Sequence, residues 1–290
     1  MPAVNDAPCL PPLRTTRPVG FAVPSDAWDV HIHAIGAPEH FPLAVDRSYT
    51  PAVVPIESYI ALMDRMGLAH AVLVQPSVYG TDNRAMLDAL RLYPDRFRAV
   101  AVVASDVSDQ ELAALDAAGV RGVRANLLNR AGISLGDAAS LAHRFVEFGW
   151  HLQLQIDVST FDRFDAIDAL PVDIVVDHMG YMPAHKSVDD PGFRRLLKRV
   201  ESGRCWVKLS APYRLTPWRQ RGFDDVLLLA RALIAANPGR MLWGSDWPHT
   251  DLRSDMPDDG DLLGLLAVWT SSAAVRDDIL VRNPAALYGR

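Results

Sequence analysis

Cysteine is scarce in this 290-residue chain, which holds only Cys9 and Cys205, far apart in the sequence. Neither belongs to a CxxC pair, so the sequence offers no disulfide framework and no cysteine-based metal site. A chain of this length can bury a sizeable core without disulfides. We therefore expect a protein of a reducing compartment, namely the cytoplasm.

Long apolar runs and basic runs are also missing. No apolar stretch reaches the roughly 18–20 residues that a membrane span needs, and the proline-rich segment 1–20 lacks the apolar centre of a secretory signal. The net charge is −6, and no run of five basic residues occurs, which argues against nucleic-acid binding. The expected partner is a small molecule, while the oligomeric state stays open.

A glycine-rich phosphate loop is absent too, since neither GxGxxG nor GxxxxGK[ST] occurs. This weighs against an open, doubly wound nucleotide-binding sheet. Short apolar runs instead alternate with amphipathic segments, a pattern typical of parallel sheets. The expected strands are 27–33, 69–75, 97–103, 120–126, 150–157, 172–178, 205–210 and 240–246.

Eight strands that alternate with helices predict an α/β protein folded as a (β/α)8 TIM barrel. One helical segment shows clear end signals: Ser108 is followed three residues later by Glu111, and Gly119 ends the pattern. No internal repeat or linker divides the chain. We expect a single barrel domain over residues 26–290, preceded by an irregular arm over residues 1–25.

Ionisable side chains gather where the expected strands end. His31 and His33 end the first strand, His178 ends the sixth and Asp246 ends the eighth. Side chains at i and i+2 share one face of a strand, and catalytic groups of such barrels lie at the carboxyl ends of the strands. A lone buried histidine is usually a core residue, but four groups from three strands predict a catalytic site.

Eight segments that carry or surround these residues resemble the amidohydrolase superfamily, in particular its lactone-processing branch. They are "DVHIHAIG", "FPLAVDRSYTP", "VLVQPSVYGTDN", "AAGVRGVRAN", "GWHLQLQ", "VVDHMG", "WGSDWPHTDLRSDMPDDG" and "NPAALYG". The resemblance implies hydrolysis of an anionic, carboxylate-bearing lactone of the pyrone-dicarboxylate or muconolactone type. Asp246 would then take a proton from water as the general base, and His31, His33 and His178 would stabilise the oxyanion.

The resemblance also implies a set of substrate-binding residues. Arg124 ends the strand 120–126 and Arg130 follows it, and arginine can hold a carboxylate bidentately. Arg214, Tyr49 and Ser77 also match substrate-binding positions of the relatives, and Gln155 and His249 are further candidates for substrate contact. Gln155 stands where pyrone-hydrolysing relatives have a tyrosine, which leaves the identity of the lactone open. For His249, support of another site residue and capping of the loop are alternatives to ligand contact.

No cofactor is expected, although a single zinc ion is an alternative. Binuclear members of the superfamily use a lysine or glutamate on the fourth strand and a histidine on the fifth. The strand 120–126 ends without such a group, and His151 begins its strand instead of ending it. One zinc ion on His31, His33 and Asp246 would still be chemically reasonable.

Three other functions remain as alternatives to lactone hydrolysis. The first is a lactonase or isomerase of sugar-acid lactones of the galactarolactone type, and the second is a zinc-dependent decarboxylase of the same superfamily. The third is a non-catalytic binding barrel, against which the intact set of histidines and aspartate argues.

Overall fold

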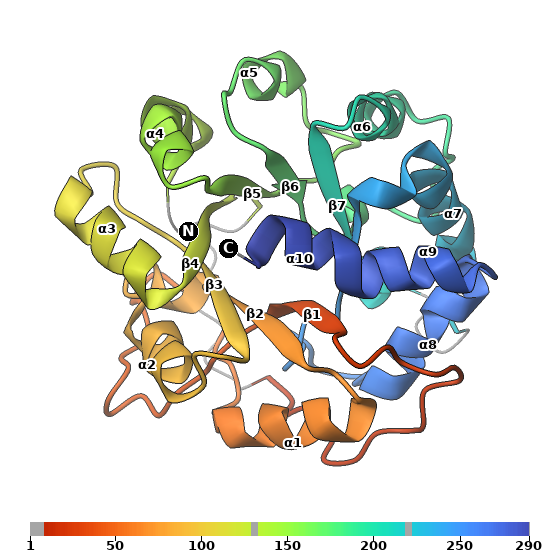
Figure 1. Cartoon of the computed structure of the whole chain (residues 1–290), viewed down its shortest axis with the longest axis horizontal. Helices are drawn as coiled ribbons and strands as arrows, with labels where there is room; N and C mark the ends of the chain where they lie inside the picture. Colours follow the sequence, from red (N-terminus) through yellow and green to blue (C-terminus); the bar gives the residue numbers. More distant parts are fainter. Residues whose placement is uncertain (1–8, 129–132, 218–221, 290) are drawn as a thin grey trace.

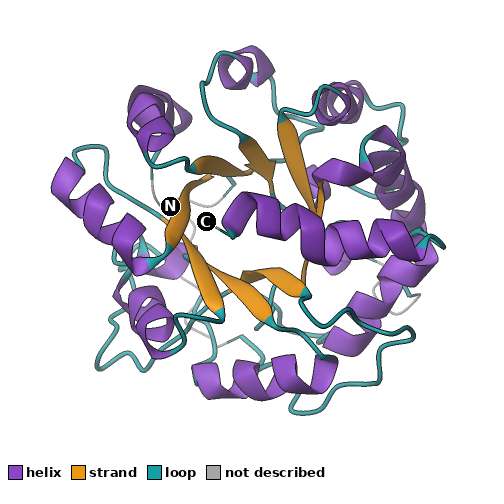
Figure 2. Cartoon of the chain, viewed as in Figure 1, coloured by secondary structure: helices purple, strands orange, loops and turns teal. Residues whose placement is uncertain are grey.

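Eight parallel strands form a closed barrel surrounded by helices (Figures 1 and 2). The computed structural model describes residues 9–128, 133–217 and 222–289. The strands pair in chain order, and a parallel bridge from Ile32 to Trp247 joins the two ends of the sheet. The strands are β1 Trp28–Ile32, β2 His70–Val74, β3 Phe97–Ala101, β4 Val120–Asn126, β5 His151–Gln155, β6 Ile174–Val176, β7 Cys205–Ser210 and β8 Met241–Gly244. The predicted (β/α)8 barrel is confirmed.

Helices cover the outside of the barrel (Figure 2). They are α1 Ile56–Met66, α2 Arg84–Leu92, α3 Asp109–Ala118, α4 Leu135–Glu147, α5 Phe164–Asp168, α6 Pro191–Glu201, α7 Leu227–Ala236, α8 Asp259–Trp269, α9 Ala273–Asp277 and α10 Asn283–Tyr288. The predicted capping box of α3 is present, with Ser108 and Glu111 each accepting a hydrogen bond from the backbone of the other. Gly119 ends α3 with a φ of 104°, which glycine adopts without steric cost.

Short helical turns connect several of these elements. They are η1 Ser77–Tyr79, η2 His178–Tyr181, η3 Pro212–Arg214, η5 Asp224–Val226, η6 Pro238–Arg240 and η7 Asp278–Arg282. Three of them, η1, η2 and η3, follow β2, β6 and β7, so they lie at the carboxyl end of the barrel, where the predicted site residues are.

The amino-terminal half of the barrel interior is apolar. It is filled by the buried side chains of Trp28, Val30, Val72, Val74, Val100, Val175, Trp206, Leu242 and Tyr288. Helix α10 lies across this end (Figure 1), and its Tyr288 ring packs on Trp28 and His151. His151 therefore lies at the opposite end of the barrel from the predicted site, as its place at the start of β5 indicates.

A bulge in β1 decides which of its side chains enter the barrel. Asp29 pairs with Ala71 and Ile32 pairs with Leu73, so three steps on β1 match two on β2. Strict alternation would place Asp29 on the same face as His31. The bulge instead turns Asp29 toward α1, where its carboxylate accepts a 2.8 Å hydrogen bond from Tyr59.

Six strands end one or two residues earlier than the sequence predicts, and three of these lead into predicted catalytic residues. β1 stops one residue before His33, β6 stops at Val176 instead of residue 178, and β8 stops at Gly244 instead of residue 246. His178 and Asp246 have φ values of 49° and 68°. This left-handed backbone cannot continue a strand, and outside glycine it is uncommon and concentrated at functional sites.

Residues 9–27 form neither helix nor strand. Cys9 and Leu10 donate backbone hydrogen bonds to the loops that follow β1 and β8, and the Arg17 backbone N–H donates to Asp258 at the start of α8. This segment is thus fastened to the carboxyl end of the barrel. Cys9 and Cys205 are both buried and free of disulfides. Within the described ranges, no helix is long and apolar enough to cross a membrane.

Candidate active site

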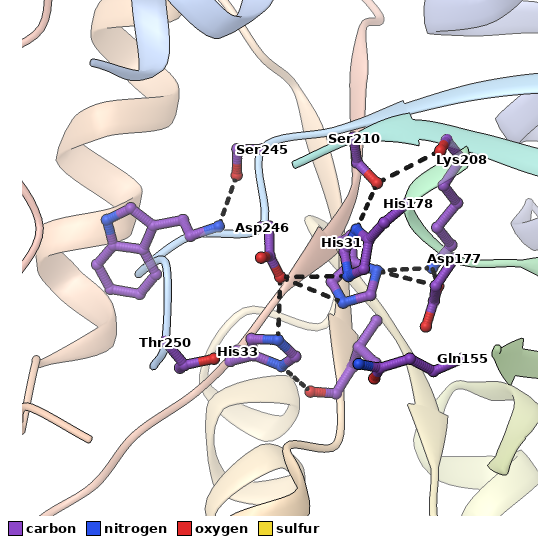
Figure 3. A network of polar contacts seen from close by, with 12 residues as sticks. His31, His33, Gln155, Asp177, His178, Lys208, Ser210, Ser245, Asp246 and Thr250 are labelled. Carbon is purple, nitrogen blue, oxygen red and sulfur yellow. Dashed lines mark hydrogen bonds and ion pairs between the residues drawn. The ribbon is translucent and has the colours of Figure 1, made fainter. Parts of the chain in front are cut away.

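The four predicted catalytic side chains meet at the carboxyl end of the barrel (Figure 3). One carboxylate oxygen, Asp246 Oδ1, is the point on which they converge. It lies 3.3 Å from His33 Nε2, 3.6 Å from His31 Nε2 and 3.7 Å from His178 Nε2. All four side chains are almost completely buried. The structure therefore brings together residues that are up to 215 positions apart in the chain.

The ring orientations of His33 and His178 are fixed by their second nitrogen atoms. His33 Nδ1 lies 2.7 Å from the carbonyl oxygen of Val74. Because a carbonyl only accepts, Nδ1 carries a proton. His178 Nδ1 lies 2.8 Å from the Ser210 hydroxyl, which can donate or accept.

The charges of the site are set by burial and by one arginine. Burial lowers the pKa of His31 well below its usual range and that of His178 to about 4, so both rings are neutral at pH 7. Burial alone would raise the pKa of Asp246, but the charge of Arg214 together with the contacts of His178, His33 and His31 outweighs it and holds this pKa well below its usual range. Asp246 Oδ2 accepts 2.7 Å hydrogen bonds from Arg214 Nε and from the Tyr213 hydroxyl.

Two buried charged residues were not predicted from the sequence. Asp177 Oδ1 and Lys208 Nζ each lie 3.3 Å from His31 Nδ1. Lys208 also donates to the Val30 carbonyl at 2.9 Å and to Gln153 Oε1 at 2.8 Å, and burial lowers its pKa to about 8. A lysine inside the apolar strand sequence "CWVKLS" was the available signal for this site.

A small cavity of about 30 Å³ adjoins the catalytic residues at the barrel mouth. Five of the predicted substrate-binding residues line it, namely Tyr49, Ser77, Arg124, Gln155 and Arg214. Four lining residues were not predicted: Asn126, Tyr181, Thr250 and Asp251. His249 is not among the described lining residues, because its side chain lies fully buried behind Asp246. Arg130 lies outside the described residues.

The cavity wall around Arg124 is a connected set of polar contacts. Arg124 Nε donates to Asp177 Oδ2 at 3.1 Å, and its Nη2 donates to Gln155 Oε1. Gln155 Nε2 in turn donates to the Tyr181 hydroxyl at 2.7 Å. Together with Lys208 and Arg214, Arg124 gives this buried network three cations against the carboxylates of Asp177 and Asp246. Arg124 and Arg214 both line the cavity, where a guanidinium can hold a carboxylate of a ligand.

The donor atoms around Asp246 Oδ1 fit a mononuclear metal ion. Tetrahedral zinc with bonds of 2.0–2.2 Å separates its ligand atoms by about 3.3–3.5 Å, close to the spacing of these nitrogens from Oδ1. His31 Nε2 and Asp246 Oδ1 are buried and have no hydrogen-bond partner among the described residues. The ligand atoms of His31, His33 and Asp246 lie close enough together to share one ion, as do those of His31, Asp177 and His178.

Comparison with known proteins places the chain in a family. The sequence model of the Amidohydrolase family matches residues 28–290. The chain is 38% identical to 2-pyrone-4,6-dicarboxylate hydrolase of Comamonas testosteroni, covering 92% of each chain. It is 36% identical to 4-sulfomuconolactone hydrolase of Rhizobium radiobacter, covering 97% of this chain and 96% of the relative.

A solved structure agrees with these sequence comparisons. It is a Pseudomonas putida protein assigned as a 2-pyrone-4,6-dicarboxylic acid hydrolase, which superimposes with a TM-score of 0.80 at 34% identity and covers 92% of this chain and 98% of its own. The fold, the site and the sequence comparisons agree, and the chain belongs to the Amidohydrolase family.

Proposed function

We propose that this protein hydrolyses a small, carboxylate-bearing lactone of the pyrone-dicarboxylate or muconolactone type, with Asp246 as the general base. The observation that carries the proposal is the position of Asp246 Oδ1 among three imidazole nitrogens in the wall of a cavity that two arginines also line. The names of the two relatives at 38% and 36% identity support the substrate class.

The proposed reaction begins with a water molecule between Asp246 Oδ1 and the lactone carbonyl. Asp246 takes a proton from this water while the oxygen attacks the carbonyl carbon. The carbonyl electrons move onto the oxygen, and donors in the site stabilise that charge. Collapse of the tetrahedral intermediate breaks the ring C–O bond, and Asp246 returns its proton to the leaving oxygen. The product is the ring-opened acid.

A low pKa makes Asp246 a weak base, so we expect its basicity to rise when substrate is bound. In the free protein, the charge of Arg214 stabilises the ionised carboxylate and makes it a weak base. A substrate carboxylate that binds Arg214 competes for the same charge. This raises the basicity of Asp246 in the complex, where the base is needed.

A zinc ion held by His31, His33 and Asp246 would polarise the lactone carbonyl and lower the pKa of a bound water. The proton on His33 Nδ1 leaves Nε2 in the form that a metal ligand requires. The two neighbours of His31 Nδ1 favour opposite states: Lys208 as a donor keeps the proton of the neutral ring on Nε2, whereas Asp177 as an acceptor draws it to Nδ1 and frees Nε2 for a metal. The metal content of the purified protein therefore distinguishes a zinc-bound site from a metal-free site.

The test is a panel of lactones incubated with the purified protein in ¹⁸O-labelled water. The panel contains 2-pyrone-4,6-dicarboxylate, muconolactones and galactarolactone, and ring opening is followed by absorbance and mass spectrometry. We expect one of the first two classes to gain the mass of one water with one ¹⁸O in the new carboxylate. A product of unchanged mass would instead support the isomerase alternative, and loss of carbon dioxide would support the decarboxylase. Elemental analysis before and after dialysis against a chelator gives the metal state.

A further inference from the structure

A buried chain of three side chains lies on the side of Asp246 that faces away from the imidazole nitrogens. The Tyr213 hydroxyl contacts Asp246 Oδ2 at 2.7 Å and His249 Nδ1 at 3.1 Å. His249 Nε2 lies 3.2 Å from Asp259 Oδ1. Tyr213, His249 and Asp259 are each at most 2% exposed, and none is among the described residues that line the cavity.

The direction of these contacts follows from the state of Asp246. A carboxylate paired with Arg214 is ionised and only accepts hydrogen bonds, so the single hydroxyl proton of Tyr213 points to Oδ2. The hydroxyl oxygen must then accept from His249, whose Nδ1 carries a proton. Asp259 Oδ1 lies 3.2 Å from the other nitrogen, without hydrogen-bond geometry. The Tyr213 hydroxyl thus links His249 to Asp246, and Asp259 lies beside the far nitrogen of the ring.

Three separate segments supply these side chains. Tyr213 belongs to η3 after β7, and Asp259 is the first residue of α8. His249 belongs to the turn that begins at Asp246, where the His249 backbone N–H donates to the Asp246 carbonyl at 2.7 Å. The spacing of three residues in "DWPH" thus brings the imidazole back beside the side chain of Asp246.

The surroundings of Tyr213 are apolar, which makes the polar chain notable. Tyr213 packs in a buried cluster with Ala211, Leu252 and Leu262. Buried polar and acidic side chains are costly to desolvate, and apolar residues of similar volume often stabilise a core as well or better. Stability alone thus does not explain a histidine and an aspartate at this place.

We propose that Tyr213, His249 and Asp259 position the catalytic base: they hold Oδ2 of Asp246 so that Oδ1 faces the histidines and the substrate. His249 is then a positioning residue that acts through the Tyr213 hydroxyl and does not contact the ligand. This inference rests on the proposed function, because it assigns a purpose to the orientation of Asp246. Arg214 pairs with the charge on Oδ2, and the three side chains set the orientation of the Asp246 carboxylate.

The test is a double-mutant cycle measured with a lactone that the wild-type protein opens. His249→Leu and Tyr213→Phe should each lower kcat by roughly 10- to 100-fold, the usual range for residues that orient a catalytic group, and leave KM unchanged. In the Tyr213→Phe background, His249→Leu should change kcat by less than about twofold, because its target hydroxyl is already gone. His249→Asn, whose amide nitrogen can replace Nδ1, should restore most of kcat.

Several outcomes would overturn the proposal. Independent, multiplying losses in the double variant would show two unrelated structural effects, and a change in KM alone would return His249 to substrate binding. If His249→Leu does not fold, Tyr213→Phe alone still tests the proposal, because a loss of kcat at unchanged KM is expected and a change in KM alone would contradict it. Asp246→Asn separates failure of the proposed function from failure of the positioning role. Full activity of Asp246→Asn would refute the proposed function. An inactive Asp246→Asn together with wild-type activity of the His249 variants would refute only the positioning role.

A structural measurement covers the case in which no lactone is opened. Crystal structures of the wild-type protein and of Tyr213→Phe require no substrate. The proposal expects the Asp246 carboxylate to rotate in the variant so that Oδ1 leaves the three imidazole nitrogens. An unchanged carboxylate orientation would contradict it.

Discussion

The two halves of the barrel interior differ sharply, although the same strands form both. At the amino end, Trp206 of β7 faces inward among valines and Tyr288. Two residues further along β7 comes Lys208, and Ser210 follows after another two. The inward residues of β6 change in the same way, from Val175 to Asp177. The apolar residues of the core and the polar residues of the site are therefore separated along the barrel axis. Lys208 and Asp177 lie at the boundary between them.

Substitution of Asp177, at the boundary between the two halves, should have the largest effect on the free energy of unfolding. Asp177→Asn removes one charge from a buried network that includes Arg124 and Lys208 and leaves their charges uncompensated. We expect the free energy of unfolding to fall by roughly 3–5 kcal/mol, as measured by urea denaturation, with loss of activity because His31 loses a partner. Asp189→Asn, at an exposed ion pair with Arg194, is the matched control and should be stable. Equal stability of the two variants would show that Asp177 carries no special energetic role.

The amino-terminal half should show the opposite behaviour. Tyr288→Ala removes a buried ring that packs on Trp28 and His151. Loss of a large core aromatic costs about 3–5 kcal/mol without removing any charged partner. At a temperature where the variant remains folded, kcat and KM should equal the wild-type values. A variant that is stable but inactive would mean that the two halves are not functionally separate.

A smaller effect is expected from the buried histidine of the apolar half. Burial lowers the pKa of His151 to about 3, so the unfolded chain binds a proton there between pH 6.5 and 3 that the folded protein excludes. Stability from this group is complete above pH 6.5 and is lost as the pH falls through this window. His151→Gln should reduce the slope of unfolding free energy against pH by up to about 1.4 kcal/mol per unit. The exposed His143→Gln is the control, and an unchanged slope in His151→Gln would contradict the assignment.

The sequence was sufficient for the fold and for the centre of the site. Alternating strands and helices predicted the barrel, and the ends of three strands predicted that His31, His33, His178 and Asp246 converge. Their side chains meet because the carboxyl ends of all parallel strands lie on one face of the barrel. Five of the seven predicted substrate-binding residues line the cavity, which supports that assignment without testing it.

Other features depend on closure and on local backbone geometry, which a linear pattern does not contain. Lys208 reaches His31 because the closed barrel brings β7 near β1, 177 residues away along the chain. The bulge in β1 turns Asp29 out of the barrel, against strict alternation. The left-handed backbone at His178 and Asp246 ends two strands early. The sequence left open whether His249 contacts the ligand, and its ring contacts Tyr213 and Asp259 and is not among the described residues that line the cavity.

The central claim is that Asp246 is the general base of a lactone hydrolase. Its most direct test is kcat/KM for ring opening by Asp246→Asn, beside Asp88→Asn, an exposed ion-pair residue of α2, as a matched control. Loss of a general base lowers rates by roughly 10²- to 10⁴-fold. The account predicts a loss of that size for Asp246→Asn and none for Asp88→Asn, with normal folding of both. Wild-type activity in Asp246→Asn would contradict it.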